Sequence, residues 1–169
     1  METAAHEFVL WLMLFAYALH ILEERMLDWL GWARATFHLD LGWADFYTTN
    51  AIVVVAGICT AMIGWKLPEV SLMFPALALV NAVLFHIGPT LLQRRFSPGV
   101  ITAVLLFLPV GIWSYYGAYL DRALSLAVGI VSAIGGAILM AYPLVLLQIR
   151  KRLPSYGKWL AASMVIGPR

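Results

Sequence analysis

The chain has 169 residues, of which 63% are hydrophobic and only 12% are charged, and its formal net charge is +2. A soluble domain of this length could not bury so many apolar side chains, so the composition predicts a single integral membrane domain over residues 1–169. The charges lie near expected helix ends and form no basic face, which argues against a nucleic-acid partner.

Five apolar stretches are long enough to cross a bilayer, whose hydrocarbon core of about 30 Å requires about 20 helical residues. They predict an all-α polytopic membrane protein, a five-transmembrane-helix bundle with spans at about 7–29, 46–65, 71–92, 100–119 and 125–148. The segment between the first two spans, about 30–45, combines aromatic residues with few charges. We expect this segment to lie at the membrane interface.

The distribution of Lys and Arg predicts the orientation of the bundle. Five spans place the first loop, the third loop and the C-terminal tail on one side of the membrane. Nine of the 11 Lys and Arg residues belong to that side: Arg25, Arg34, Arg94, Arg95, Arg150, Lys151, Arg152, Lys158 and Arg169. Because positive residues favour the cytoplasmic side, we expect the N-terminus outside and the C-terminus in the cytoplasm.

The first span ends in three ionisable residues. Residues 8–22 are apolar apart from His20 and too short to cross alone, so the helix must continue through Glu23 and Glu24. Ionisable groups inside a bilayer cost about 2.5–3.5 kcal/mol at the centre and usually mark function. The i, i+3 and i+4 spacing places all three on one helical face, which Tyr17 joins.

The third span carries a second histidine. His86 and Thr90 are four residues apart and share a helical face. Pro89 cannot donate to the carbonyl of Phe85, which therefore needs another partner in lipid. Asn81 precedes His86 by five residues, roughly 140° around a regular helix, so it faces elsewhere unless the helix is distorted, as Pro89 predicts.

In this topology, polar side chains of all five helices approach one depth in the cytoplasmic leaflet. Two imidazoles and two carboxylates there suit a divalent transition metal, zinc or iron, with His20, Glu23, Glu24 and His86 as ligands. The metal would neutralise the carboxylates and could polarise a substrate oxygen or activate a water. The alternative is a carboxylate pair at the membrane edge that reaches toward water or pairs with an arginine.

The same groups could also work without a metal. Adjacent carboxylates disfavour joint ionisation, so Glu23 or Glu24 could hold a proton and act with His20 in acid–base catalysis. The same property would serve a proton-coupled transporter. Around these groups we expect residues that contact the substrate or support the ligands: Tyr17, Asn50, Asn81 and Thr90. Asn50 and Asn81 could instead join helices, and His38 and Asp40 could close over the site or remain solvated.

His20-Ile-Leu-Glu23-Glu24, at the end of a first span, resembles the signature of the HXXEE-domain family of small prokaryotic integral membrane proteins. The chain resembles that family at two further places: Asn81 with His86, and Arg95-Phe-Ser-Pro98-Gly99 at the start of the fourth span. The resemblance covers roughly residues 8–150 and implies the prokaryotic inner (cytoplasmic) membrane. The function of the family is undefined, so the resemblance supports a site without naming a reaction.

We therefore expect a membrane metalloenzyme with a site in the cytoplasmic leaflet. Its substrate would be a lipid or another apolar molecule that enters from the bilayer, because the short loops offer no place for a large polar substrate. One alternative is a metal-free acid–base isomerase or cyclase of an isoprenoid-like molecule. Another is a small proton- or metal-coupled transporter, although such proteins usually show an inverted repeat that this chain lacks.

Overall fold

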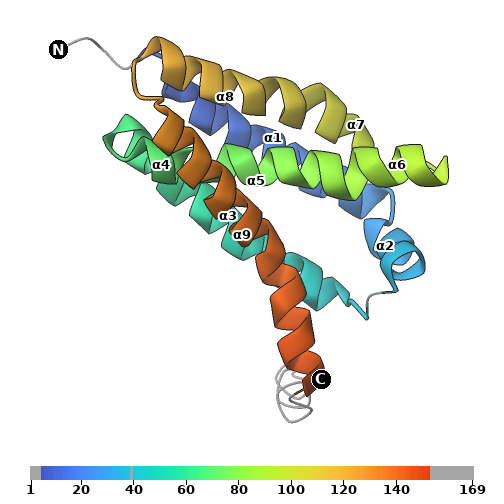
Figure 1. The fold of residues 1–169 in the computed structure, drawn as a ribbon. Helices are drawn as coiled ribbons and strands as arrows, with labels where there is room; N and C mark the ends of the chain where they lie inside the picture. The colour runs from blue at the N-terminus through green and yellow to red at the C-terminus, as the bar shows by residue number, and fades with distance from the viewer. Residues whose placement is uncertain (1–4, 39, 153–169) are drawn as a thin grey trace, which may run out of the picture.

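The computed structural model describes residues 5–38 and 40–152, and all the regular elements in this part of the chain are helical (Figure 1). The α-helices are α1 Phe8–Met26, α2 Trp29–Phe37, α3 Trp43–Ile63, α4 Pro68–Ser71, α5 Met73–Asn81, α6 Gly88–Gln93, α7 Val100–Thr102, α8 Leu108–Leu120 and α9 Leu126–Arg152. The 3₁₀ turn η1 covers Gly64–Lys66, and the π-helical turns η2 and η3 cover Ala82–Ile87 and Ala103–Phe107. The all-α prediction is confirmed.

Four helical segments are long and apolar enough to cross a membrane, as expected of a membrane protein: Trp43–Lys66, Pro68–Gln93, Val100–Leu120 and Leu126–Val145. They match the last four predicted spans within a few residues. The predicted count of five is not shown, because the remaining segment forms α1, whose last turns carry Glu23, Glu24 and Arg25. Lys158 and Arg169, which entered the predicted orientation, lie outside the described residues.

The predicted interfacial segment 30–45 is mostly helical. It forms α2 and a short connection to α3, which begins at Trp43 rather than at residue 46. Asp28 begins α2 in a left-handed conformation, and its side chain accepts a hydrogen bond from Gly31 N. Leu30 and Ala33 of α2 are buried against Leu41. An amphipathic helix therefore lies at the end of α1 that carries the ionisable residues (Figure 1).

The centre of the bundle is apolar and its outside is also apolar. Met13, Phe74, Ala78 and Phe107 belong to the buried core that α1, α5 and η3 share. Large apolar side chains on the outer faces are exposed, among them Leu84, Leu105 and Ile138. Soluble monomers rarely expose so much contiguous apolar surface, whereas a helix bundle in lipid requires it.

Helix α9 packs on α5 through a very close approach of the two backbones. A Cβ atom added at Gly136 would lie 2.4 Å from the Cβ of Ala76 and 2.7 Å from the backbone nitrogen of Leu77. Small residues permit such contacts between membrane helices. Beyond this crossing, α9 extends away from α1 and α8 toward the C-terminus (Figure 1).

Two membrane helices contain a π-helical turn just before a proline. In η2, which precedes Pro89, the N–H of Gly88 bonds the carbonyl of Val83, five residues back instead of four. The same arrangement occurs in η3 before Pro109. Because proline removes a helical donor and clashes with the preceding turn, it explains why the helix widens at these points.

At the opposite end of α1, a set of polar contacts links the residues before α1 to the residues that follow α3 and α8. We call this set the N-terminal clasp. The backbone N and Nδ1 of His6 lie 2.8 and 2.7 Å from the two carboxylate oxygens of Asp121. The indole of Trp65 donates to Asp121 Oδ2 at 2.9 Å, and the backbone N–H of Trp65 donates to Glu7 Oε1 at 2.6 Å. The clasp therefore ties the start of α1 to the ends of α3 and α8.

We expect Asp121→Asn to destabilise the fold at neutral pH and to have little effect in acid. Burial alone would raise the pKa of the Asp121 carboxyl, but the donors of His6 and Trp65 outweigh it and hold that pKa below its ordinary value of 3.8. Because the pKa is lower in the folded state, the ionised carboxylate stabilises the fold above pH 3.8, and this contribution is lost as the pH falls through the folded-state pKa. Thermal unfolding of the full chain in detergent, from about pH 7 to about pH 3, measures the effect.

The exposed residue Asp40 provides the control for this experiment. Asp40→Asn should unfold like the wild-type chain throughout the pH series. A gap between Asp121→Asn and the wild type that keeps its size into acid would contradict a stabilising carboxylate in the clasp.

Candidate metal centre

Three of the four predicted metal ligands meet inside the bundle. His20 and Glu24 lie on α1, and His86 lies on η2. Oε1 of Glu24 is 3.5 Å from Nε2 of His20 and 3.5 Å from Nε2 of His86. One ligand atom from each residue lies within 4.8 Å of those of the other two. All three side chains are buried, and we call this group the His20–Glu24–His86 centre.

The hydrogen bonds of His20 determine which of its nitrogens carries the proton. Its Nδ1 lies 2.7 Å from Oγ1 of Thr102, and that hydroxyl lies 2.5 Å from Oε2 of Glu23. Because the carboxylate can only accept, the hydroxyl donates to Glu23 and the histidine Nδ1–H donates to the hydroxyl. Nε2 of His20 is then left with its lone pair directed toward Glu24.

His86 is held in the same way by a loop residue. Its Nδ1 lies 3.2 Å from Oγ of Ser97, which lies 3.4 Å from the carbonyl oxygen of Phe85. That carbonyl is the one that Pro89 deprives of its helical donor, so the predicted need for another partner is met by Ser97. We therefore place the proton of His86 on Nδ1, from which it donates to Ser97 Oγ. This leaves the Nε2 lone pair facing Glu24.

Neither Nε2 atom has a hydrogen-bond partner, although both are buried. Two lone pairs and a carboxylate oxygen that face one another in an apolar interior are unfavourable unless a proton or a cation lies between them. Zinc bonds of about 2.0–2.2 Å in tetrahedral geometry place neighbouring ligand atoms about 3.3 Å apart. The separations of 3.5 Å from Glu24 Oε1 to each Nε2 are close to this value, and all three ligand atoms lie within 4.8 Å of one another.

The structure places Glu23 at the start of the fourth predicted span instead of in this centre. Its carboxylate accepts the backbone N–H groups of Gly99 at 3.0 Å, Ile101 at 3.1 Å and Thr102 at 2.7 Å. These are donors that a helix leaves without partners at its N-terminus, where a negative charge is also favoured. Glu23 reaches the centre through the Thr102 hydroxyl, which joins it to His20.

Gly99 lies directly against both imidazoles. Its φ of +96° belongs to the region that favours glycine. A Cβ atom there would lie 2.5 Å from Cε1 of His86 and 2.8 Å from Cε1 of His20. Only glycine can therefore occupy position 99, where the chain enters the fourth span against the two histidines. This gives a physical reason for the Pro-Gly element noted in the sequence.

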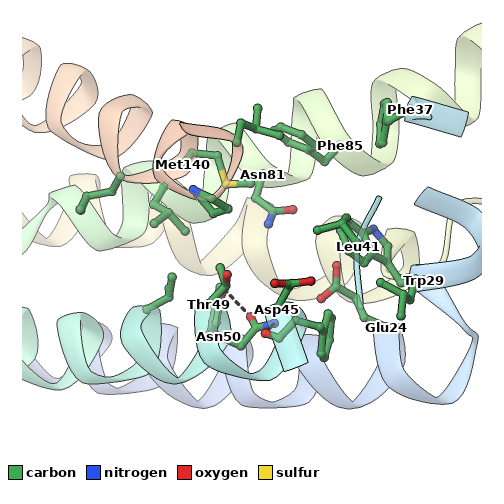
Figure 2. A pocket seen from close by; sticks show the side chains of 18 residues that line it. Glu24, Trp29, Phe37, Leu41, Asp45, Thr49, Asn50, Asn81, Phe85 and Met140 are labelled. Atoms are coloured by element: carbon green, nitrogen blue, oxygen red, sulfur yellow. Dashed lines mark hydrogen bonds between the residues drawn. The ribbon is translucent and has the colours of Figure 1, made fainter. Parts of the chain in front are cut away.

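A cavity of about 90 Å³ adjoins the centre, and Glu24 belongs to both (Figure 2). Its polar lining includes Tyr17 and Asn50, which are joined by a hydrogen bond of 2.8 Å from the phenol to Asn50 Oδ1. The amide of Asn50 donates to the Phe46 carbonyl at 3.0 Å. The predicted supporting residues Tyr17 and Asn50 thus lie beside the cavity, and their hydrogen bond joins α1 to α3.

Asn81 also lines this cavity, with its amide directed inward (Figure 2). A straight helix would place Asn81 and His86 on different faces, but η2 begins immediately after Asn81. Hydrogen bonds that reach back five residues bring positions five apart close to one face, so the π-helical turn turns both residues inward. The distortion on which the sequence expectation depended is therefore present, and both side chains are buried.

The other predicted residues lie outside the centre. Thr90 accepts the backbone N–H of Ser97 at 3.2 Å and so supports the loop that holds His86. His38 and Asp40 are exposed after α2 and do not belong to the group of three. Sequence reasoning assigned no role to Ser97, whose only signal was its position before the Pro-Gly pair, or to Thr102 as a bridge between Glu23 and His20.

Comparison with known proteins identifies the family. The sequence profile of a family described as "Protein of unknown function with HXXEE motif" matches residues 11–114, which include most of α1, the whole His20–Glu24–His86 centre and Gly99. No curated protein and no solved structure matches the chain. The motif is His20, Glu23 and Glu24 of α1. The side chains of His20 and Glu24 belong to the His20–Glu24–His86 centre, and that of Glu23 caps the start of the fourth predicted span. The matched segment covers more than half of the chain, and the protein therefore belongs to the HXXEE family.

Proposed function

We propose that the protein is an enzyme of the prokaryotic cytoplasmic membrane that uses a divalent transition metal, zinc or iron, held by His20, Glu24 and His86. The observation that carries this proposal is the pair of buried, unpartnered Nε2 atoms, each 3.5 Å from the same Glu24 oxygen. Three protein ligands leave a coordination position open, which is typical of catalytic rather than structural zinc sites. A metal there could polarise a substrate oxygen or lower the pKa of a bound water to about 7.

The ligand types agree with this choice of metals. Imidazole nitrogen and carboxylate oxygen suit zinc and iron, whereas magnesium and calcium prefer oxygen ligands alone. The Nδ1 hydrogen bonds of both histidines fix the ring orientation that a metal requires, as in many metal sites. Glu23 would then act on the metal indirectly, by holding Thr102 and thereby His20.

We propose α1 as a fifth span, with the N-terminus outside and the C-terminus in the cytoplasm. This is supported by the burial of α1 against α3 and α8 and by the excess of Lys and Arg on the side expected to be cytoplasmic. Hydrogen bonds to the fourth span satisfy Glu23, and Glu24 would be neutralised by the metal, so two charges near the end of α1 need not prevent insertion. The centre would then lie in the cytoplasmic leaflet.

The substrate that fits such an enzyme is a lipid or another apolar molecule. Leu77, Leu139 and Met140 give the cavity beside Glu24 an apolar wall that is formed by α5 and α9. The exposed apolar faces of the bundle would be in contact with lipid, so such a molecule could arrive from the bilayer without crossing water.

The test is elemental analysis of the full chain purified in detergent without chelator. We expect about one zinc or iron per chain in the wild type and a loss of most of it in His20→Ala and in His86→Ala, since each removes one of three ligands from a different helix. Loss in both variants would tie α1 and η2 to one site.

The exposed residue His38 offers a matched control for these substitutions. His38→Ala should keep the metal content of the wild type. An absence of metal from the wild-type protein, or metal that persists in both His20→Ala and His86→Ala, would overturn the metal proposal. An absence would also direct attention to metal-free acid–base chemistry or proton-coupled transport by the same carboxylates.

A further inference from the structure

The cavity beside Glu24 follows the direction of the membrane helices. Its wall on α3 is one helical face, formed by Asp45, Phe46, Thr49, Asn50 and Val53. Val53 follows Asp45 by eight residues, which is a length of about 12 Å at 1.5 Å per residue. Helix α3 belongs to a segment able to cross a membrane, and such helices tilt by only about 20° from the bilayer normal. The long direction of the cavity is therefore also the direction of lipid chains.

The two ends of the cavity differ in polarity. Glu24 lines one end and also belongs to the His20–Glu24–His86 centre. It lies beside Asp45 in Figure 2, and Val53 is about two turns further along α3. Val53 and Leu77 line the other end and belong to the buried apolar core. A ligand that follows the cavity therefore has a polar group beside Glu24 and an apolar part beside Leu77.

The cavity is open on the side between α3 and α9. Tyr17 and Leu77, which line its inner wall, are buried. Thr49 of α3 and Met140 of α9 are partly exposed, and they lie on opposite sides of the cavity (Figure 2). Leu144 of α9 also lines the cavity and is 38% exposed. Since Met140 and Leu144 belong to the candidate span Leu126–Val145, the opening lies at membrane depth, where it faces hydrocarbon.

On the side of α2, aromatic contacts close the cavity. The rings of Phe37 and Phe85 meet edge to face, with centroids 5.9 Å apart, and join α2 to η2. The rings of Trp29 and Phe46, with centroids 6.0 Å apart, join α2 to α3. All four residues line the cavity. The side between α3 and α9 is therefore the route by which a molecule from the bilayer can enter.

The cavity is too small to enclose a whole lipid. It encloses about 90 Å³, whereas a cavity of about 150 Å³ holds a single benzene molecule. Only a few atoms of a ligand can therefore be surrounded by protein. The rest of the molecule must lie along the open side, in contact with the bilayer.

We infer that the substrate is a lipid with a polar group at one end, which enters sideways between α3 and α9. The polar group lies beside Glu24, and the chain follows the cavity toward Leu77 and stays partly in the bilayer. This inference rests on the proposed function, because it takes the cavity to be the substrate site and the helices to span the membrane. It adds the route of entry and the direction of the chain, and it excludes substrates that dissolve in water.

The experiment locates a photoreactive chain inside the protein. The full-length protein in nanodiscs is equilibrated with hexadecanol that carries a diazirine either in the middle of the chain or next to the hydroxyl group. After illumination, mass spectrometry of the digested protein locates the adducts. The head group of hexadecanol is small and uncharged, so labelling reports the position of the chain rather than the charge of the cavity.

The segment 74–78 of α5 is the reporter of entry. Leu77 lines the cavity, and every residue of this segment is buried: Phe74, Pro75, Ala76, Leu77 and Ala78. A chain that only surrounds the bundle cannot reach it. We expect the diazirine in the middle of the chain to label this segment at least about fivefold more than the diazirine next to the hydroxyl group, since the latter lies beside Glu24.

Tryptophan substitutions at the opening test the route. Met140→Trp and Thr49→Trp narrow the opening from two different helices, and each should reduce the adducts on segment 74–78 at least about fivefold. Ile138→Trp and Val55→Trp are the matched controls, because these positions of α9 and α3 are 65% and 59% exposed and do not line the cavity. Both controls should label like the wild type.

Three results would overturn the inference. The first is an absence of adducts on segment 74–78 while the exposed Leu84 is labelled, and the second is equal labelling of the segment by the two probes. The third is unchanged labelling in both Met140→Trp and Thr49→Trp. The comparison of the two probes needs only the wild-type chain, so it stands even if a tryptophan variant does not fold.

The outcome is separable from that of the metal proposal. Elemental analysis of the same preparation reports the metal, and labelling of segment 74–78 reports the entry of the chain. Labelling of this segment in a protein that holds no metal would support the entry route alone. Bound metal without labelling of this segment would support the metal centre alone and overturn the entry route.

Discussion

Substitution of Gly99 by alanine is expected to abolish metal binding and to lower the free energy of unfolding by about 2–4 kcal/mol. The new methyl group would lie 2.5 Å from His86 and 2.8 Å from His20, closer than carbon atoms can approach. The positive φ of this residue adds strain for any side chain. Since the collisions fall on rings that are packed on every side, both histidines must move away from Glu24.

Two measurements on Gly99→Ala separate the effects. Elemental analysis reports the metal content, and thermal unfolding of the full chain in detergent reports stability. Gly129→Ala is the matched control, because the one atom of the described residues that a Cβ at Gly129 would meet within 4 Å belongs to Leu124, at 3.9 Å. This control should keep its metal and be as stable as the wild type or slightly more so. A Gly99→Ala protein with full metal content would show that the histidines do not depend on this contact.

Substitutions of the adjacent residues Glu23 and Glu24 are expected to have different effects, one on stability and the other on metal binding. Glu23→Ala removes the acceptor of three backbone N–H groups and of the Thr102 hydroxyl, so we expect a loss of about 2–4 kcal/mol in stability. Glu24→Gln removes one of the proposed metal ligands but no hydrogen bond to the fourth span. We expect it to cause at least about a tenfold loss of metal affinity while the metal-free protein unfolds near the wild-type temperature.

Comparison of these variants by thermal unfolding, with and without added zinc, tests the division of roles. Zinc should raise the unfolding temperature of the wild type and of Glu23→Gln, which keeps one acceptor oxygen, but not that of Glu24→Gln. The same loss of stability and of metal in Glu23→Ala and Glu24→Gln would contradict separate roles for the two residues. It would then place both carboxylates in one site, as the sequence spacing suggested.

Helical periodicity explains why the sequence predicted much of the centre. Ionisable residues at the end of an apolar segment are costly wherever the helix goes, so His20 and Glu24 identified the site before any fold was known. The i, i+4 spacing alone places both on one face of α1, because it depends only on the geometry of a single helix. The apolar content of the chain likewise determined that it is all-helical and suited to a membrane, since lipid leaves few alternatives for the backbone.

The tertiary structure alone decided the partners of Glu23, Asn81 and Gly99. Glu23 and Glu24 are adjacent at the end of α1, so their spacing from His20 could not show that the two carboxylates have different partners. Its partners are backbone N–H groups 76 to 79 residues away, which no local pattern reveals. Asn81 turns inward because the helix widens before Pro89, and periodicity assumes a regular helix. Gly99 is required by two imidazoles that approach it from other helices, and only the packed bundle brings them there.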